Sequence, residues 1–218
     1  MSKSIFIFLH GFSLYLLLII IPGAGYAQEE YQPVKDTDAF RQQMLETSQN
    51  THSISSDFVQ LKHLSFLEED IESTGIFYFK KENQLRWEYT RPFFYLIIFS
   101  HDTIMIQDDQ KTSHYDAASG RIFREINNIM LSMVNGSILE SEEFTFEYFE
   151  NADSYKLELS PQDPNMKAFL TKIRLFINKD DYAVDELFMI EKSDDYTHIR
   201  FINKRLNEDI PQHIFDLH

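Results

Sequence analysis

The residues of this chain that could do acid–base or metal chemistry are histidines that stand near carboxylates. His101 precedes Asp102, His114 stands two residues before Asp116, and residues 68–70 read Glu-Glu-Asp. None of them has the spacing of a known metal motif, such as two histidines four residues apart with a glutamate between them. No G-x-S-x-G element or Gly-rich phosphate loop occurs. These acidic residues fall at predicted turns and strand edges, where a solvated surface is the ordinary outcome.

The chain contains no cysteine, which removes thiol nucleophiles and zinc–thiolate sites. With no constellation that meets the requirements of an active site, the sequence predicts a protein that is not an enzyme and that has no catalytic residue, metal site or cofactor. The missing cysteine also excludes a bacterial lipoprotein, because the lipid is attached to a cysteine that follows the signal peptide. An exported chain of this kind must be stabilised by burial alone.

Residues 1–27 have the pattern of a secretory signal peptide. One lysine supplies a positive charge, an apolar run follows that is densest at residues 14–21, and the small residues Gly25 and Ala27 stand just before the expected cut. The alternative is an uncleaved membrane anchor, for which the interrupted apolar run is barely long enough. We expect cleavage after Ala27, which leaves one exported domain over residues 28–218.

The full chain has a formal net charge of −15, and loss of the leader with its one lysine makes the charge more negative by one unit. Nucleic acids and anionic membrane surfaces attract proteins with clustered Lys and Arg. Neither is therefore an expected partner. The charge fits a monomer that stays dispersed in an aqueous compartment.

Alternation of apolar and polar residues dominates the chain after residue 50, and this is the pattern of β-strands with one apolar face. The clearest example is 84–91, where Leu85, Trp87 and Tyr89 alternate with polar residues until Pro92. Turn residues separate the segments. The predicted strands are 56–63, 71–81, 84–91, 94–100, 103–108, 111–116, 143–150, 154–160, 168–178, 183–192 and 196–204.

Two segments have helical periodicity instead. The first is 38–49, which Asp36 or Asp38 can cap. Its apolar face is expected to carry Phe40, Met44, Leu45 and Ser48. The second is a short helix within 120–139 that ends at Asn135-Gly136. Its apolar face carries Ile122, Ile126, Ile129, Met130 and Met133.

Eleven strands with two or three helices are too many for one flat sheet that buries a single face. A strongly curved antiparallel sheet, with helices plugging its concave side, accommodates them. We therefore expect a mainly β, α+β fold. No linker, repeat or low-complexity block divides the chain. The 20 Phe, 11 Tyr and 7 Met predict a bulky, adaptable interior.

The order of these segments resembles the LolA-like family of outer-membrane lipoprotein carriers. The resemblance runs from about Asp38 to Phe215 and includes SISSDFVQLKHL, STGIFYFKKENQLRWEYTRP and LIIFSHDTIMIQDD. Its most specific part is the block from Gly75 to Pro92. The resemblance implies a half-barrel sheet with helices as a lid over an apolar cavity. It also implies a carrier that takes lipoprotein acyl chains from an inner-membrane lipoprotein-releasing transporter towards an outer-membrane acceptor.

The expected lipid-binding residues combine this resemblance with alternation along the strands. By position, Leu85, Trp87 and Ile97 match apolar residues that line the family's cavity. The full set is Phe77, Phe79, Leu85, Trp87, Tyr89, Tyr95, Ile97 and Phe99 in the strands and Ile126, Met130 and Met133 in the lid. An ordinary hydrophobic core is the alternative for each of them. Residues 93–99 are apolar on both faces and need cover on both sides, one of which could be lid or lipid.

Lys81 falls where the best-known members of the family carry an arginine that ties the lid shut. The chain departs from the family here, since the next residue is Glu82 and not proline. We expect the Lys81 ammonium to donate hydrogen bonds to carbonyls of residues 133–136, because the end of a helix leaves carbonyls unpaired and carries partial negative charge. The alternative is a charge at the rim of an apolar face.

Two other binding functions remain open. One is a carrier of a different amphiphile, such as a glycolipid or a lipid-linked pigment. The other is a sensor of the same fold that detects mislocalised lipoproteins, although the sequence shows no additional domain for signalling.

Overall fold

The computed structural model describes residues 30–81, 84–100, 103–116, 132 and 136–216. The predicted signal peptide lies outside the described residues. So do the lid residues Ile126, Met130 and Met133 and the carbonyl-bearing residues 133–135.

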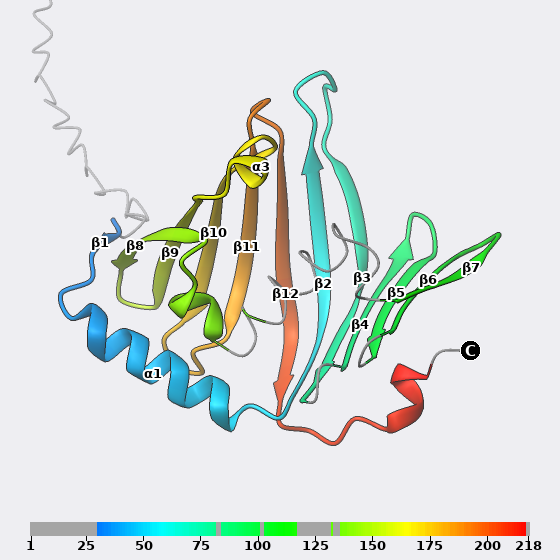
Figure 1. The fold of residues 1–218 in the computed structure, drawn as a ribbon, viewed down its shortest axis with the longest axis horizontal. Coiled ribbons are helices and arrows are strands. Elements are labelled where there is room, and N and C mark those ends of the chain that lie inside the picture. Colours follow the sequence, from blue (N-terminus) through cyan, green and yellow to red (C-terminus); the bar gives the residue numbers. More distant parts are fainter. Residues whose placement is uncertain (1–29, 82–83, 101–102, 117–131, 133–135, 217–218) are drawn as a thin grey trace, which may run out of the picture.

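In the described chain, twelve antiparallel strands form one sheet with the order β1-β8-β9-β10-β11-β12-β2-β3-β4-β5-β6-β7 (Figure 1). Strands β1 and β7 are its edges, so the sheet is open and does not close into a barrel. The strands are β1 (Gln32–Pro33), β2 (Ser53–His63), β3 (Ile71–Lys80), β4 (Gln84–Arg91), β5 (Tyr95–Ser100), β6 (Thr103–Asp108), β7 (Thr112–Asp116), β8 (Phe144–Glu150), β9 (Ser154–Pro161), β10 (Leu170–Asn178), β11 (Val184–Glu191) and β12 (Tyr196–Leu206).

All eleven predicted strands are present, and their ends differ from the predicted ones by three residues at most. The prediction missed β1, a two-residue strand that pairs with β8. The helical segments are α1 (Thr37–Asn50), α3 (Pro164–Lys167) and the 3₁₀ turns η1 (Ser137–Glu140) and η2 (Gln212–Phe215). The mainly β architecture with few helices is confirmed.

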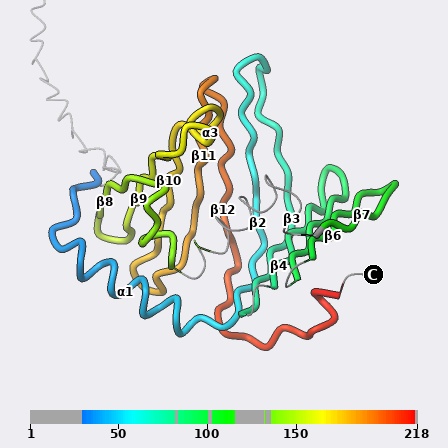
Figure 2. The backbone as a smooth tube through the Cα atoms, viewed as in Figure 1, coloured from blue at the N-terminus to red at the C-terminus, as the bar shows by residue number. Residues whose placement is uncertain are grey.

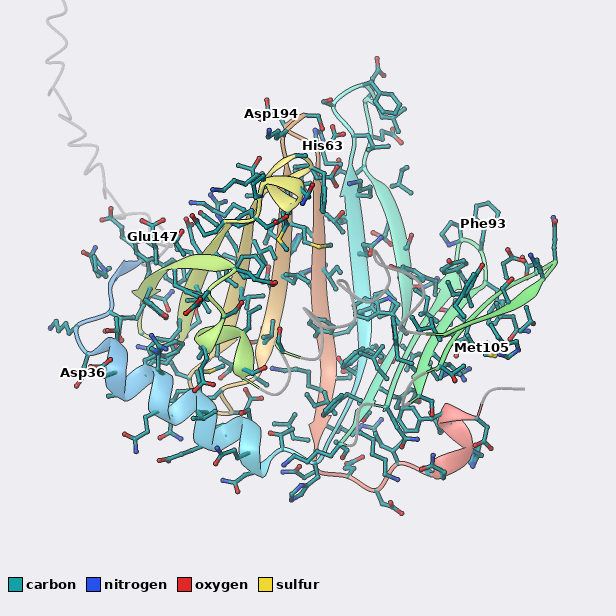
Figure 3. All side chains as sticks on the ribbon, viewed as in Figure 1. Asp36, His63, Phe93, Met105, Glu147 and Asp194 are labelled. Atoms are coloured by element: carbon teal, nitrogen blue, oxygen red, sulfur yellow. The ribbon has the colours of Figure 1, made fainter. Side chains whose placement is uncertain are left out.

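Helix α1 begins where the sequence predicts and crosses one end of the strands β8 to β11 (Figures 1 and 2). The side chain of Asp36 caps it by accepting a hydrogen bond of 2.9 Å from the Ala39 N–H, and Figure 3 labels Asp36 at this end of the helix. Phe40, Met44 and Ser48 are buried on the predicted face. The face of the sheet against which these side chains pack is called the inner face below. α1 covers it over this half of the sheet.

The inner face carries two hydrophobic clusters. We call the first the helix-covered cluster, because α1, η1 and α3 all contribute to it. Its buried members are Phe40, Met44, Ile138, Leu139, Phe144, Leu157, Leu159, Met166, Leu170, Ile173, Leu175 and Ile177. The second is the aromatic cluster, and its described members all come from strands. They are Phe58, Phe77, Phe79, Leu85, Trp87, Phe99, Ile104 and Ile199.

Gly75 shows why the block that carries the family resemblance begins with a glycine. It pairs with Phe58 on β2 and with Tyr89 on β4. A Cβ atom at this position would lie 1.9 Å from the carbonyl oxygen of Glu88 and 2.5 Å from the ring of Phe58. Only a residue without a side chain lets the aromatic cluster and the β4 backbone approach β3 so closely.

The outer face of β5 is covered by protein, as its two-sided apolar sequence requires. Leu96, Ile98 and Met105 form a small buried cluster there. The C-terminal segment lies against β4 and β5, and the guanidinium of Arg86 donates a hydrogen bond of 3.1 Å to the carbonyl of Ile214. Lid or lipid is therefore needed, at most, on the inner side of this strand. None of the helices described here has the length and apolar character needed to cross a membrane.

Candidate functional site

An apolar cavity of about 110 Å³ lies between α1 and the inner face of the sheet, where the two clusters meet. Its walls come from α1, from β2, β3 and β4 on one side, and from β10, β11 and β12 on the other. The lining residues are Met44, Thr47, Ser48, Thr51, Ile54, Ser56, Phe77, Trp87, Leu175, Asp181, Tyr182, Ala183, Val184, Leu187, Phe201, Lys204 and Leu206.

Two of the predicted lipid-binding residues, Phe77 and Trp87, line this cavity. The other predicted strand residues lie behind or beside them. Phe79, Leu85 and Phe99 are buried members of the aromatic cluster, Tyr89 and Ile97 pack against it, and Tyr95 contacts the ring of Tyr89. The structure thus places two of the eight predicted strand residues at the cavity and the other six in or beside the aromatic cluster.

Trp87, the only tryptophan in the chain, has four aromatic neighbours, of which Tyr89 is the most distant, with ring centroids 6.4 Å apart. Its ring centroid lies 4.8 Å from that of Phe58, 5.4 Å from that of Phe77 and 6.1 Å from that of Phe201. Tilted and edge-to-face contacts of this kind add to the stabilisation that burial provides. The indole is therefore held as a rigid part of the cavity wall.

The wall also contains polar groups in an apolar setting. The hydroxyl of Tyr89 lies 2.9 Å from Oε1 of Gln60, to which it donates a hydrogen bond. Burial raises the pKa of Tyr89, and the polar groups of Trp87 and Gln60 only partly offset that rise. The indole N–H of Trp87 is buried and makes no hydrogen bond of normal geometry. A ligand that carries an acceptor could satisfy it.

Sequence reasoning missed the α1 side of the cavity and its β10–β12 wall. Met44 and Ser48 were placed on the apolar face of the first helix, but the sequence did not show that this face borders a site. Leu175 and Phe201 follow ordinary alternation, which reveals the face of a strand and not the partner across the sheet. For Lys204, simple alternation gives no signal at all.

Helix α1 is held by a side-chain hydrogen bond near each of its two ends. Near its start, Nη2 of Arg41 donates a hydrogen bond of 2.9 Å to the carbonyl of Leu139. At its end, the ammonium of Lys81 donates to the carbonyl of Gln49. The structure thus gives Lys81 a helix-end carbonyl of α1 as an acceptor, while residues 133–135, which carry most of the carbonyls expected from the sequence, lie outside the described residues.

The histidine and carboxylate pairs do not assemble a chemical site among the described residues. His101 and Asp102 lie outside them, and His114 is exposed on the edge strand β7. Asp70 lies against His63, with Oδ1 2.7 Å from Nδ1 of the imidazole ring. In the described part of the chain, no group of three or more such side chains could hold a metal ion.

Residues 49–218 match the family model of the outer membrane lipoprotein carrier protein LolA. This chain belongs to the LolA family. The matched residues include β2 to β12 and η2, and so contain most of the cavity wall. No curated protein matches the chain. The family resemblance read from the sequence is therefore confirmed.

Solved structures of other proteins are similar to this chain at low sequence identity. A chain of the Pseudomonas aeruginosa MucA/MucB complex is 11% identical, with a TM-score of 0.52 over 84% of this chain and 62% of that one. An uncharacterized conserved protein from Thermus thermophilus is 8% identical, with a TM-score of 0.52 over 81% of this chain and 93% of that one. A LolA superfamily protein from Nitrosomonas europaea is 12% identical, with a TM-score of 0.44 over 81% and 97%.

Membership of the family supports a coarse statement of function. The LolA family is one of lipid-binding or carrier proteins that are generally non-enzymatic and typically work outside the cytoplasm. The cavity between α1 and the aromatic cluster is the place where this chain offers an apolar ligand a site.

Proposed function

We propose that this protein is a periplasmic carrier that binds the acyl chains of lipoproteins and moves them from the inner towards the outer membrane. The observation that supports it best is the apolar cavity between α1 and the rigid wall around Trp87. Donor and acceptor would be an inner-membrane lipoprotein-releasing transporter and an outer-membrane acceptor. The chain would reach the periplasm through cleavage of residues 1–27.

The size of the cavity suggests how such a carrier could release its cargo. A cavity of ~150 Å³ holds one benzene molecule, and the cavity here measures about 110 Å³. It therefore has room for only part of an acyl chain. Burying ~16 carbons contributes about 12 kcal/mol, which for two or three chains would exceed any reversible affinity. Displacing α1 or its neighbours would offset part of that gain and keep the complex able to unload.

Helix α1 is the element whose displacement would open the cavity among the described residues. Its side chains Met44, Thr47 and Ser48 line the space that an acyl chain would occupy. The bond from Lys81 to Gln49 holds the end of this helix to the turn after β3. We therefore keep Lys81 as a candidate latch, acting on α1.

The experiment that tests the proposal is to purify the protein from its native periplasm and identify what co-purifies by mass spectrometry. Acylated lipoprotein peptides would support the proposal. Free lipids in their place would favour a carrier of another amphiphile, such as a glycolipid or a lipid-linked pigment. A protein that arrives empty and turns over a small substrate would contradict both.

A second candidate function is a lipoprotein sensor that acts by assembling with a partner protein. The likeness to a chain of the MucA/MucB complex favours it, since that chain has the same fold and is part of a protein complex. This chain spans only 62% of the length of that one. Co-purification of a stoichiometric protein partner in the same experiment would favour the sensor.

A further inference from the structure

The charged groups of the cavity wall gather at one end. Asp181 and Lys204 are the only charged residues among the described lining residues. They belong to the turn before β11 and to the end of β12, and the side chain of Asp181 is 35% exposed to solvent. The rest of the lining is apolar or carries hydroxyl groups. An amphiphile whose tail fills the apolar part would therefore place its polar part at this end.

A bulge in β12 aims Lys204 into the cavity wall. Phe201 faces the cavity, so regular alternation would turn Lys204 to the outer face. The register slips between Ile202 and Arg205, and Asn203 adopts a left-handed conformation with φ of 56°. Bulges of this kind re-aim side chains next to functional sites. Lys204 therefore lines the cavity, and its ammonium lies against the carboxylates of Asp181 and Asp185.

Two carboxylates already neutralise that ammonium. Nζ of Lys204 lies 2.5 Å from Oδ1 of Asp185 and 3.4 Å from Oδ2 of Asp181. The other two carboxylate oxygens accept hydrogen bonds from the Ala183 N–H, at 2.8 Å, and from the Asn178 side chain, at 3.1 Å. Since each carboxylate oxygen can accept two hydrogen bonds, both side chains keep acceptor capacity towards a ligand.

This triad of Asp181, Asp185 and Lys204 has a net charge of −1. An anionic head group would have to compete with the two carboxylates for the Lys204 ammonium, and it would then be repelled by both of them. A head group that donates hydrogen bonds can instead use the free lone pairs of Asp181, and an ammonium gains from the net charge as well. The indole N–H of Trp87 in the cavity lining, which makes no hydrogen bond of normal geometry, offers a bond to an ester or amide carbonyl of the ligand.

We propose that the triad is a head-group subsite that selects amphiphiles with a hydrogen-bond-donating head, an ammonium above all, and that excludes anionic amphiphiles such as fatty acids. The proposal rests on the proposed function, since it assumes an acyl chain in the cavity. It narrows the cargo to amphiphiles whose head carries an ammonium or an amide N–H, as the free or acylated amino terminus of a lipid-modified peptide does.

The test uses three probes with the same tail: dodecylammonium, N-dodecylacetamide and dodecanoate, each below the concentration at which it forms micelles. Binding to the mature protein is followed by the fluorescence of Trp87. The expected order of affinity is ammonium, then amide, then carboxylate. Asp181→Asn should weaken dodecylammonium about tenfold, strengthen dodecanoate and leave the amide within about twofold, as expected for loss of one charge-assisted hydrogen bond.

Asp180→Asn is the matched control, because Asp180 is exposed on the same turn and does not line the cavity. Asp185→Asn is the second variant if Asp181→Asn fails to fold. Equal affinity for the three probes, or tighter binding of dodecanoate, would overturn the head-group proposal. If the native protein then still carries acylated peptides, the proposed function stands without it. If no probe binds and the native protein is empty, both fail.

Discussion

The two clusters on the inner face of the sheet are built differently, although Leu187 packs against both. The helix-covered cluster is mainly aliphatic and takes residues from strands and from three helical segments. The aromatic cluster takes its described residues from strands alone, and five of its eight buried members are Phe or Trp. The cavity lies at the boundary between them. The comparison suggests that one cluster supplies stability and the other supplies a surface for a ligand.

Packing chemistry explains why the clusters differ. Aliphatic side chains interlock at high density, and that density makes a core intolerant of change. Aromatic rings that meet edge to face form a rigid apolar surface of large area, and an apolar ligand can pack against that surface. In the aromatic cluster, the rings of Phe77 and Trp87 pack edge to face against each other, and both residues also line the cavity.

The largest effect is expected from Leu157→Ala in the helix-covered cluster. Leu157 is fully buried on β9, and truncation of such a residue typically costs ~2–5 kcal/mol of unfolding free energy. Urea unfolding measures it, with Phe77→Leu at the cavity as the comparison. Phe77→Leu should cost less than half as much and weaken binding of a lipopeptide. An equal loss of unfolding free energy in both variants would contradict the idea that the helix-covered cluster supplies stability and the aromatic cluster supplies a ligand surface.

The strands were predictable because apolar and polar residues alternate over most of their length and turn residues separate them. The strand β1 was not, because two residues that join by backbone pairing alone leave no pattern in side-chain types. The start of α1 was predictable from Asp36, whose side chain caps it as expected. Gly75 could be read as part of a motif, but its reason, the ring of Phe58 against it, needs the tertiary structure.

The candidate site was predictable only in part. Alternation identifies Phe77 and Trp87 as members of an apolar face, and the structure places them in the cavity wall. It does not reveal which distant strands complete that wall, so Leu175 was missed. Lys204 was beyond reach for another reason, since a one-residue bulge reverses the face on which it lies.

A second prediction concerns the outer face behind the helix-covered cluster, where Glu158 binds three cations. Its carboxylate accepts a hydrogen bond from Lys172 and lies within 3.0 Å of Arg174 and 3.4 Å of Lys156. Burial by itself would raise the pKa of Glu158, but these partners outweigh it and hold the pKa below its usual range. Glu158→Gln should cost about 2 kcal/mol at pH 7, the strength of a hydrogen bond to a charged group.

The pH dependence follows from the direction of that shift. Because the pKa of Glu158 is lower in the folded than in the unfolded protein, its contribution is complete above the unfolded value of ~4.3. It is lost as the pH falls through the folded value. Urea unfolding of wild type and Glu158→Gln should therefore differ at pH 7 and converge at acid pH. A difference that is constant with pH would show that the carboxylate charge is not responsible.

A third prediction tests how firmly α1 is held over the cavity. Lys81→Leu removes the hydrogen bond to the Gln49 carbonyl and the favourable charge at the helix end. The amides of α1 should then exchange their hydrogens about tenfold faster, while those of β9 and β10 keep their protection, since one charge-assisted bond corresponds to about that factor. Lys81→Arg should restore slow exchange. If the amides of α1 exchange at the wild-type rate in Lys81→Leu, Lys81 does not hold the helix and is only a charge at the rim of the apolar face.

The smallest effect on stability, and the most direct test of the cavity, is expected from Ala183→Leu. Ala183 lines the cavity beside Val184, and its backbone N–H already bonds to Asp181. The added carbons would occupy part of the 110 Å³. Burial contributes ~0.8 kcal/mol per methylene, while overpacking opposes it by ~1–3 kcal/mol. The net change in unfolding free energy should therefore stay within about 1 kcal/mol.

Binding should respond much more strongly than stability to Ala183→Leu, because the new side chain takes the place of the acyl chain. We expect the affinity for N-dodecylacetamide to fall at least tenfold. The control is Ala168→Leu, which adds the same side chain at an exposed position after α3. If Ala183→Leu folds normally and binds the amide as the wild type does, the ligand does not enter this cavity. The division between a stabilising cluster and a binding wall would then have to be abandoned, even if the protein still carries lipid elsewhere.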